Sequence, residues 1–178
     1  MTQEKDKFIH MREYSRVDAQ IPFEYRVVSP EEIYKLSSRI SADTTITYFA
    51  TPKEHEDRLL AEWLKLINNK LDSIIMLLTF HREGFSTLPY RDVNISGGGM
   101  SFHAKEPHDI GTMMELKMLL PMFPPVAMFI YAEVVKCERD KDEWIVGVKF
   151  IKIDEEIRDE IVRFVFKRQR ETMRERRK

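Results

Sequence analysis

The sequence predicts a mainly β protein with helices (α+β), built around one small antiparallel β-barrel. Three observations predict it. Strand-like stretches follow one another from residue 86 onward, turn signals separate them at hairpin spacing, and one long helical pattern precedes them. The 178 residues suffice for one domain with its own core and one embellishment. We therefore expect a single domain over 1–178 that contains a helical insertion.

The first strand is predicted at 21–29, where aromatic and β-branched residues cluster in IPFEYRVVS. No other strand lies beside it in the sequence, so we expect it to pair with strands later in the chain. Five more strands complete a six-stranded barrel over 86–153, and they are predicted at 88–95, 99–104, 112–120, 126–137 and 143–151. Residues 154–178 then form a C-terminal helix with a basic end and an apolar stripe of Ile157, Ile161, Phe164 and Val165.

Residues 30–84 are predicted to be a helical insertion after the first strand. The stretch SPEE at 29–32 offers an N-cap serine, a proline at the first helical position and a glutamate at the third, so a short helix should run to about Ile40. Residues 41–50 fit either a loop or a short strand. The stretch TPKE at 51–54 repeats the helix-start pattern, and the helix that it begins should run over 52–82, roughly 45 Å at 1.5 Å per residue.

The long helix carries an unbroken apolar repeat with spacings of 4, 3, 4, 3 and 4 residues. Its members are Leu60, Leu64, Ile67, Leu71, Ile74 and Leu78. Leucine at the a positions with mostly isoleucine at the d positions favours trimers and tetramers over dimers. We therefore predict self-association through this helix, with a parallel four-helix seam favoured over a dimer. Packing of the helix on its own barrel is the alternative.

Composition and charge exclude several classes of protein. The net charge is −1 and there is one cysteine, Cys137, so neither a general affinity for nucleic acid nor an intrachain disulfide is indicated. The N-terminus has no apolar core segment and no apolar run is long enough to span a bilayer, so we expect a cytoplasmic protein. Nucleophile elbow, phosphate-binding loop and metal-spaced histidine patterns are missing from the sequence. We expect no enzyme, no metal site and no cofactor.

Two short motifs carry the functional prediction. Arg12 and Arg16 form R-x-x-x-R before the first strand, and Asn94, Ser96 and Gly99 form N-x-S-x-x-G at a strand turn. Each motif alone would arise often by chance. Together, in this order and between a matching opening and closing sequence, they resemble PilZ domains, the bacterial receptor modules for cyclic di-GMP. The resemblance covers about 11–29 and 86–168, and the departure from it is the insertion of about 55 residues.

The resemblance implies a nucleotide site with two walls. Residues 1–20 would be a flexible ligand-binding arm, with two arginines whose planar forks suit phosphate oxygens and the O6/N7 edge of guanine. Asn94 and Ser96 would hydrogen-bond a guanine edge, and Gly99 would let the nucleotide approach the backbone or adopt a positive φ. The alternative is that these residues serve only a turn or a bulge. Met11, before the first arginine, favours one nucleotide per chain.

Two other functions remain open at this stage. Some PilZ-like proteins with a helical insertion form tetramers and lack the nucleotide motifs, so the chain could be an adaptor that acts through its oligomeric helices and an unknown downstream protein. The last twelve residues carry seven Lys or Arg and two Glu. This basic end suits a helix C-terminus, and binding of nucleic acid through it is the less favoured alternative.

Overall fold

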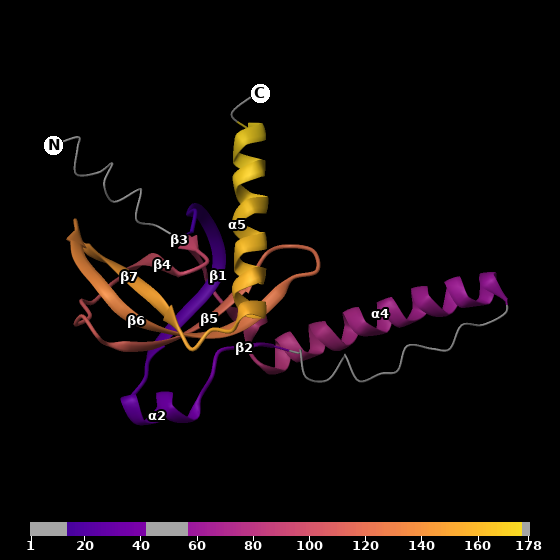
Figure 1. The fold of residues 1–178 in the computed structure, drawn as a ribbon, viewed down its shortest axis with the longest axis horizontal. Coiled ribbons are helices and arrows are strands. Elements are labelled where there is room, and N and C mark those ends of the chain that lie inside the picture. The colour runs from indigo at the N-terminus through magenta and orange to yellow at the C-terminus, as the bar shows by residue number, and fades with distance from the viewer. Residues whose placement is uncertain (1–13, 42–56, 176–178) are drawn as a thin grey trace.

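Six long strands close into an antiparallel barrel, as the sequence predicts (Figure 1). The computed structural model describes residues 14–41 and 57–175. Around the barrel the strands follow the order β6-β5-β1-β3-β4-β7, and pairing between β6 and β7 closes the ring. Their bounds are β1 (Val17–Val27), β3 (Tyr90–Ser96), β4 (Gly99–Ala104), β5 (Met113–Leu120), β6 (Val126–Asp140) and β7 (Glu143–Ile151). A two-residue strand, β2 (Arg39–Ile40), also pairs with β6.

Strand β1 joins two parts of the barrel. Its first half pairs with β3, from Val17 opposite Ile95 to Pro22 opposite Tyr90, and its second half pairs with β5. The expectation that the first strand pairs with later strands is therefore confirmed. The strand begins at Val17 rather than at residue 21, because the alternating side chains from Val17 onward already face the core. The predicted flexible arm is consequently too long, since residues 17–20 belong to the barrel.

Strand β6 is long enough to serve three neighbours. One edge of this 15-residue strand pairs with β5, and the other edge pairs first with β2 and then with β7. The register with β7 shifts between Val134 and Lys136, and the extra residue, Val135, is half exposed. Such a bulge bends the strand and increases its twist, which suits the closure of a small barrel.

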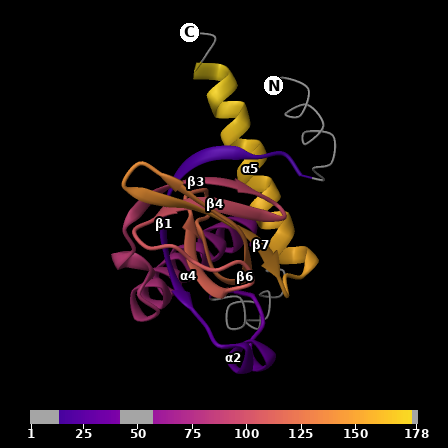
Figure 2. The same ribbon diagram turned by 90° about the vertical axis from the view of Figure 1, so that its left-hand side faces the viewer.

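Helix α5 (Glu155–Glu175) covers the barrel core along its N-terminal half. The side chain of Asp154 accepts a hydrogen bond from the backbone N–H of Ile157 at 2.9 Å and so caps the helix start. The predicted apolar stripe is buried in the barrel core, and its members are Ile157, Ile161, Phe164 and Val165. The C-terminal half of the helix extends beyond the barrel, at the end of the molecule opposite α2 (Figures 1 and 2).

Helix α2 (Pro30–Lys35) begins with the predicted capping box, in which Ser29 and Glu32 exchange hydrogen bonds. It ends at Lys35, before the predicted end at Ile40, because the chain turns back to the sheet. The hydroxyl of Ser38 donates to the carbonyl of Ile151 and accepts from the N–H of Tyr131. These tertiary hydrogen bonds draw Arg39 and Ile40 into pairing with β6 instead of further helical turns.

A polar network holds α2 against the barrel. Arg26 bonds both oxygens of Glu115, at 2.8 and 3.2 Å, and also reaches Glu32, while the hydroxyl of Tyr131 donates to Glu115 at 2.5 Å. Burial alone would raise the pKa of Glu115. The hydrogen bonds from Arg26 and Tyr131 and the charge of Arg26 outweigh burial, so the pKa lies below its usual value. Burial and the neighbouring carboxylate raise the pKa of Tyr131, which keeps its hydroxyl a donor.

Helix α4 (Arg58–Arg82) projects away from the barrel (Figure 1). Asp57 caps its start by accepting from the N–H groups of Leu59 and Leu60. The predicted start at Thr51–Pro52 lies outside the described residues. Among the described residues, α4 is anchored at its C-terminal end, where Phe80 packs with Phe85 of the 3₁₀ turn η1 (Phe85–Thr87) and with a small apolar cluster that includes Ala127 of β6. None of the described helices is long and apolar enough to cross a bilayer.

Candidate functional site

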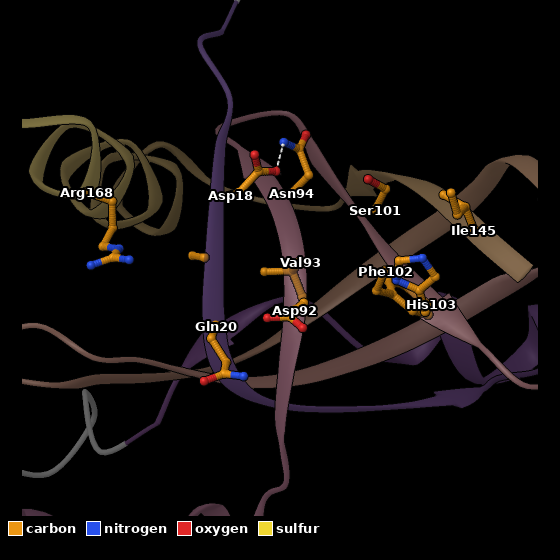
Figure 3. A pocket seen from close by; sticks show the side chains of 11 residues that line it. Asp18, Gln20, Asp92, Val93, Asn94, Ser101, Phe102, His103, Ile145 and Arg168 are labelled. Atoms are coloured by element: carbon orange, nitrogen blue, oxygen red, sulfur yellow. Dashed lines mark hydrogen bonds between the residues drawn. The ribbon is translucent and has the colours of Figure 1, made fainter. Parts of the chain in front are cut away.

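A hollow of about 600 Å³ lies on the outer surface of the barrel, over β1, β3 and β4. We refer to it as the β1–β3–β4 hollow. Figure 3 shows its wall: polar side chains project from neighbouring strands, and Arg168 faces them from α5. The lining residues are Asp18, Ala19, Gln20, Asp92, Val93, Asn94, Ser101, Phe102, His103, Ile145 and Arg168.

Strand register explains how the polar residues gather. Asp18 on β1 lies opposite Asn94 on β3, and Asn94 lies opposite Ser101 on β4, so the three side chains form one row across three strands. A second pair, Gln20 and Asp92, lies one step further along the same face. Because side chains alternate across a strand, the residues between them point inward and fill the core.

Arg16 and Asn94, one residue from each motif, lie together beside this hollow. The guanidinium Nη1 of Arg16 donates to Oδ1 of Asn94 at 3.4 Å, and the Asn94 amide donates to Oδ1 of Asp18 at 2.6 Å (Figure 3). The two motif residues are 78 positions apart in the sequence. Arg12 lies outside the described residues.

Ser96 and Gly99 occupy a different position from Arg16 and Asn94. Ser96 is buried, and its hydroxyl donates to the carbonyl of Gly99 at 3.1 Å, within the β3–β4 hairpin. A Cβ added to Gly99 would lie 2.2 Å from the carbonyl oxygen of Val148 on β7, and Gly99 does not have a positive φ. The structure therefore gives Ser96 a role within the β3–β4 hairpin and Gly99 a role in the close packing of β4 on β7, and neither lines the hollow.

Sequence reasoning missed most of the wall. Asp18 and Gln20 continue the outward face of β1 after Arg16, and this alternation was the available signal. Asp92, on the same outward face of β3 as Asn94, is not part of the N-x-S-x-x-G motif. Arg168 carried no specific signal, because it is one of several basic residues near the C-terminus. It is paired with Glu171 at 2.8 Å on the same helix.

The chemistry of the wall suits a ligand that both accepts and donates hydrogen bonds. Asp18 and Asp92 are acceptors, the guanidinium groups of Arg16 and Arg168 are donors, and the amides and hydroxyl can do either. Arg forks favour planar, bidentate partners such as phosphate. Within the residues that the structure describes, no group of three or more His, Cys, Asp or Glu side chains is placed to hold a metal ion.

The exposed surface of α4 is a second candidate site. All six residues of the predicted seam lie on this helix, and their exposed fractions run from 40 to 64%. Five other large apolar residues of α4 are also exposed at 37% or more, namely Leu59, Trp63, Leu66, Ile75 and Leu77. Within the part of the chain that the structure describes, the alternative in which the helix packs on its own barrel holds for the C-terminal end, where Phe80 is buried. We call the seam residues together the α4 seam.

Comparison with known proteins agrees with this fold. The family model of the PilZ domain matches residues 76–167. None of the curated proteins matches the chain. Among solved structures, a pathogenic protein from Xanthomonas campestris is similar to this chain with a TM-score of 0.60, 16% sequence identity and coverage of 92% of each chain. That protein is described as a tetrameric PilZ domain self-assembled via a helical bundle.

Proposed function

Because the chain belongs to the PilZ domain family, we propose that it is a receptor for cyclic di-GMP that binds its ligand at the β1–β3–β4 hollow. The observation that carries the proposal is the contact between Arg16 and Asn94. These residues come from the two halves of the resemblance, and they meet at the edge of a hollow that could take a nucleotide base. Ligand binding would act by shifting the population of conformations or partner surfaces, without catalysis.

The polar groups around the hollow match the chemistry of this ligand. Cyclic di-GMP offers two phosphates, which suit the forks of Arg16 and Arg168. Its guanines carry acceptors at O6 and N7 and a donor at the 2-amino group. The carboxylates of Asp18 and Asp92 can accept from such donors, and the Asn94 amide can serve either edge. Arg168 would exchange its partner Glu171 for a phosphate.

Titration calorimetry with cyclic di-GMP tests the proposal. We expect Arg16→Ala to weaken binding about tenfold or more, since a hydrogen bond to a charged group contributes about 1.5–3 kcal/mol. Arg16→Lys should recover only part of the loss, because lysine keeps the charge and loses the fork. The control is Arg82→Ala, which removes an arginine from α4. A wild-type protein that gives no heat would overturn the proposal and favour an adaptor without a nucleotide site.

We also propose that the chain self-associates through the α4 seam. Eleven large apolar side chains exposed on one projecting helix exceed what a monomeric surface normally leaves uncovered. The tetrameric relative from Xanthomonas, which assembles via a helical bundle, supports the same interpretation. Leucine at the a positions with mostly isoleucine at the d positions favours trimers and tetramers over dimers, and among these we favour four parallel helices.

A further inference from the structure

Tyr14, two residues before Arg16, contacts the β3–β4 turn and α5 through its ring. We infer that Tyr14 is a positioning residue: its ring seats on the Gly97–Gly98 turn under Arg158 and thereby sets Arg16 beside Asn94. The anchor itself is independent of any ligand. Its effect on binding rests on the proposed receptor function.

The first support is the surface that the two glycines provide. A Cβ added to Gly97 would lie 3.0 Å from Cδ1 of Tyr14, and one added to Gly98 would lie 3.4 Å from Cδ2 of the same ring. The ring therefore lies across both glycines. Neither glycine has a positive φ, so backbone conformation does not require glycine here. At Gly97 the reason that remains is space for the ring and for Val162 of α5, which would lie 2.8 Å from the added Cβ, whereas a Cβ at Gly98 would meet the ring at ordinary contact distance.

The second support is that α5 contacts the segment Tyr14–Arg16 at two points along the helix. The guanidinium carbon of Arg158 lies 5.4 Å from the centre of the Tyr14 ring, a distance suited to a cation–π contact. Nη1 of Arg158 also donates to the carbonyl of Gly97 at 3.3 Å. Further along α5, Nε2 of Gln169 donates to the backbone carbonyl of Arg16 at 3.4 Å. Arg158 thus bridges the ring and the turn beneath it.

The third support is the limited freedom that remains between the anchor and the site. Only Ser15 separates Tyr14 from Arg16, and Val17 is already paired with Ile95. When the Tyr14 ring is in place, the side chain of Arg16 can reach only a limited region, and Asn94 lies in that region. Without the ring, Arg16 would spend more time elsewhere. Apparent affinity falls in proportion to the fraction of chains in the binding-competent arrangement.

Two measurements on the full chain test this inference. The first is limited trypsin digestion without nucleotide, followed by mass spectrometry of the new terminus at Val17, since cleavage after Arg16 needs the segment to leave the barrel. The second is calorimetric titration with cyclic di-GMP. Tyr14→Ala removes the ring, and Tyr14→Phe keeps it. Gly97→Ala collides with the ring and with α5, and Gly98→Ala, whose Cβ meets the ring at ordinary contact distance, is the matched control.

We expect Tyr14→Ala and Gly97→Ala to speed cleavage after Arg16 several-fold and to weaken nucleotide binding about tenfold, with Tyr14→Phe and Gly98→Ala close to wild type. Unchanged cleavage in Tyr14→Ala would overturn the anchor. Faster cleavage with unchanged or tighter binding would overturn the positioning role, because the anchor would then be neutral or inhibitory. If the wild type binds no nucleotide, the receptor function and the positioning role both fail, and the cleavage rates still decide on the anchor.

Discussion

Replacement of Leu71 by Asp is the most direct test of the α4 seam. In the single chain the side chain of Leu71 is 50% exposed, and that of Leu66 on the same helix is 45% exposed. Leu66 does not occupy an a or d position of the heptad repeat. Leu66→Asp therefore removes the same atoms, adds the same carboxylate and costs similar helix propensity. Any difference between the two variants reports what covers Leu71 in the assembled protein.

The size of the effect follows from the exposed fractions. Burying a whole leucine side chain contributes about 1.5–3 kcal/mol, so covering the exposed half of Leu71 contributes about 1 kcal/mol. On the same scale, the six seam residues together contribute on the order of 4–9 kcal/mol per chain. A carboxylate in the seam loses the free energy that burial of Leu71 contributes, and its desolvation costs several kcal/mol more. Symmetry repeats this loss in every chain, so the seam should not survive it.

Sedimentation analysis at micromolar concentration reads out the result. We expect the wild type and Leu66→Asp to sediment as oligomers, with four times the 21.2 kDa of one chain for a four-helix bundle, and Leu71→Asp to sediment as a monomer. The circular dichroism of the barrel should be unchanged, because the N-terminal part of α4 lies away from the core. A wild type that stays monomeric at high concentration refutes the reasoning. Equal dissociation of both variants would refute the assignment of the seam.

Two further predictions concern the barrel itself. Gly99→Ala should lower the free energy of unfolding by about 1–3 kcal/mol in the absence of nucleotide, because its Cβ meets the Val148 carbonyl; thermal unfolding beside Gly98→Ala checks it, and an unchanged melting temperature would contradict it. Glu115→Gln should cost about 1–3 kcal/mol at neutral pH. The native pKa of Glu115 is lowered, so the unfolded chain binds more protons than the native chain as the pH falls. The greater stability of the wild type over Glu115→Gln is therefore present above about pH 4. It is lost as the pH falls through the native pKa of Glu115. Urea denaturation of both proteins at neutral and acidic pH measures this, and a constant difference would count against the network with Tyr131.

Most of the fold could be predicted because it depends on local patterns. Alternating apolar residues mark β3 to β7, and the Ser29–Glu32 capping box marks the start of α2. The errors arise where distant contacts decide. The short helix ends early because Ser38 bonds Ile151 and Tyr131, which lie more than 90 residues away in the chain. The first strand starts early because β3 extends its pairing to Val17.

The candidate site was harder to predict, because a motif names residue types without their neighbours. The pairing of Arg16 with Asn94 agrees with the motif. Gly99 looked like part of a ligand wall, but the atom that excludes a side chain there is the carbonyl of Val148, on a strand that the motif does not contain. Arg168 reaches the hollow only because α5 crosses the barrel beside β1. Neither the contact of Gly99 with Val148 nor the position of Arg168 can be predicted from the local sequence.

The β1–β3–β4 hollow and the base of α4 lie on separate parts of the same barrel. The hollow uses the half of β1 that pairs with β3, whereas the base of α4 packs on residues of β5 and β6, including Leu119 and Phe129. β1 alone pairs with both β3 and β5. The anchor at Tyr14 lies on the side of α5, whose C-terminal half stands clear of the barrel. We therefore expect a ligand that moves Arg16 to act first on α5, because Arg158 contacts the Tyr14 ring and Gln169 donates to the Arg16 carbonyl.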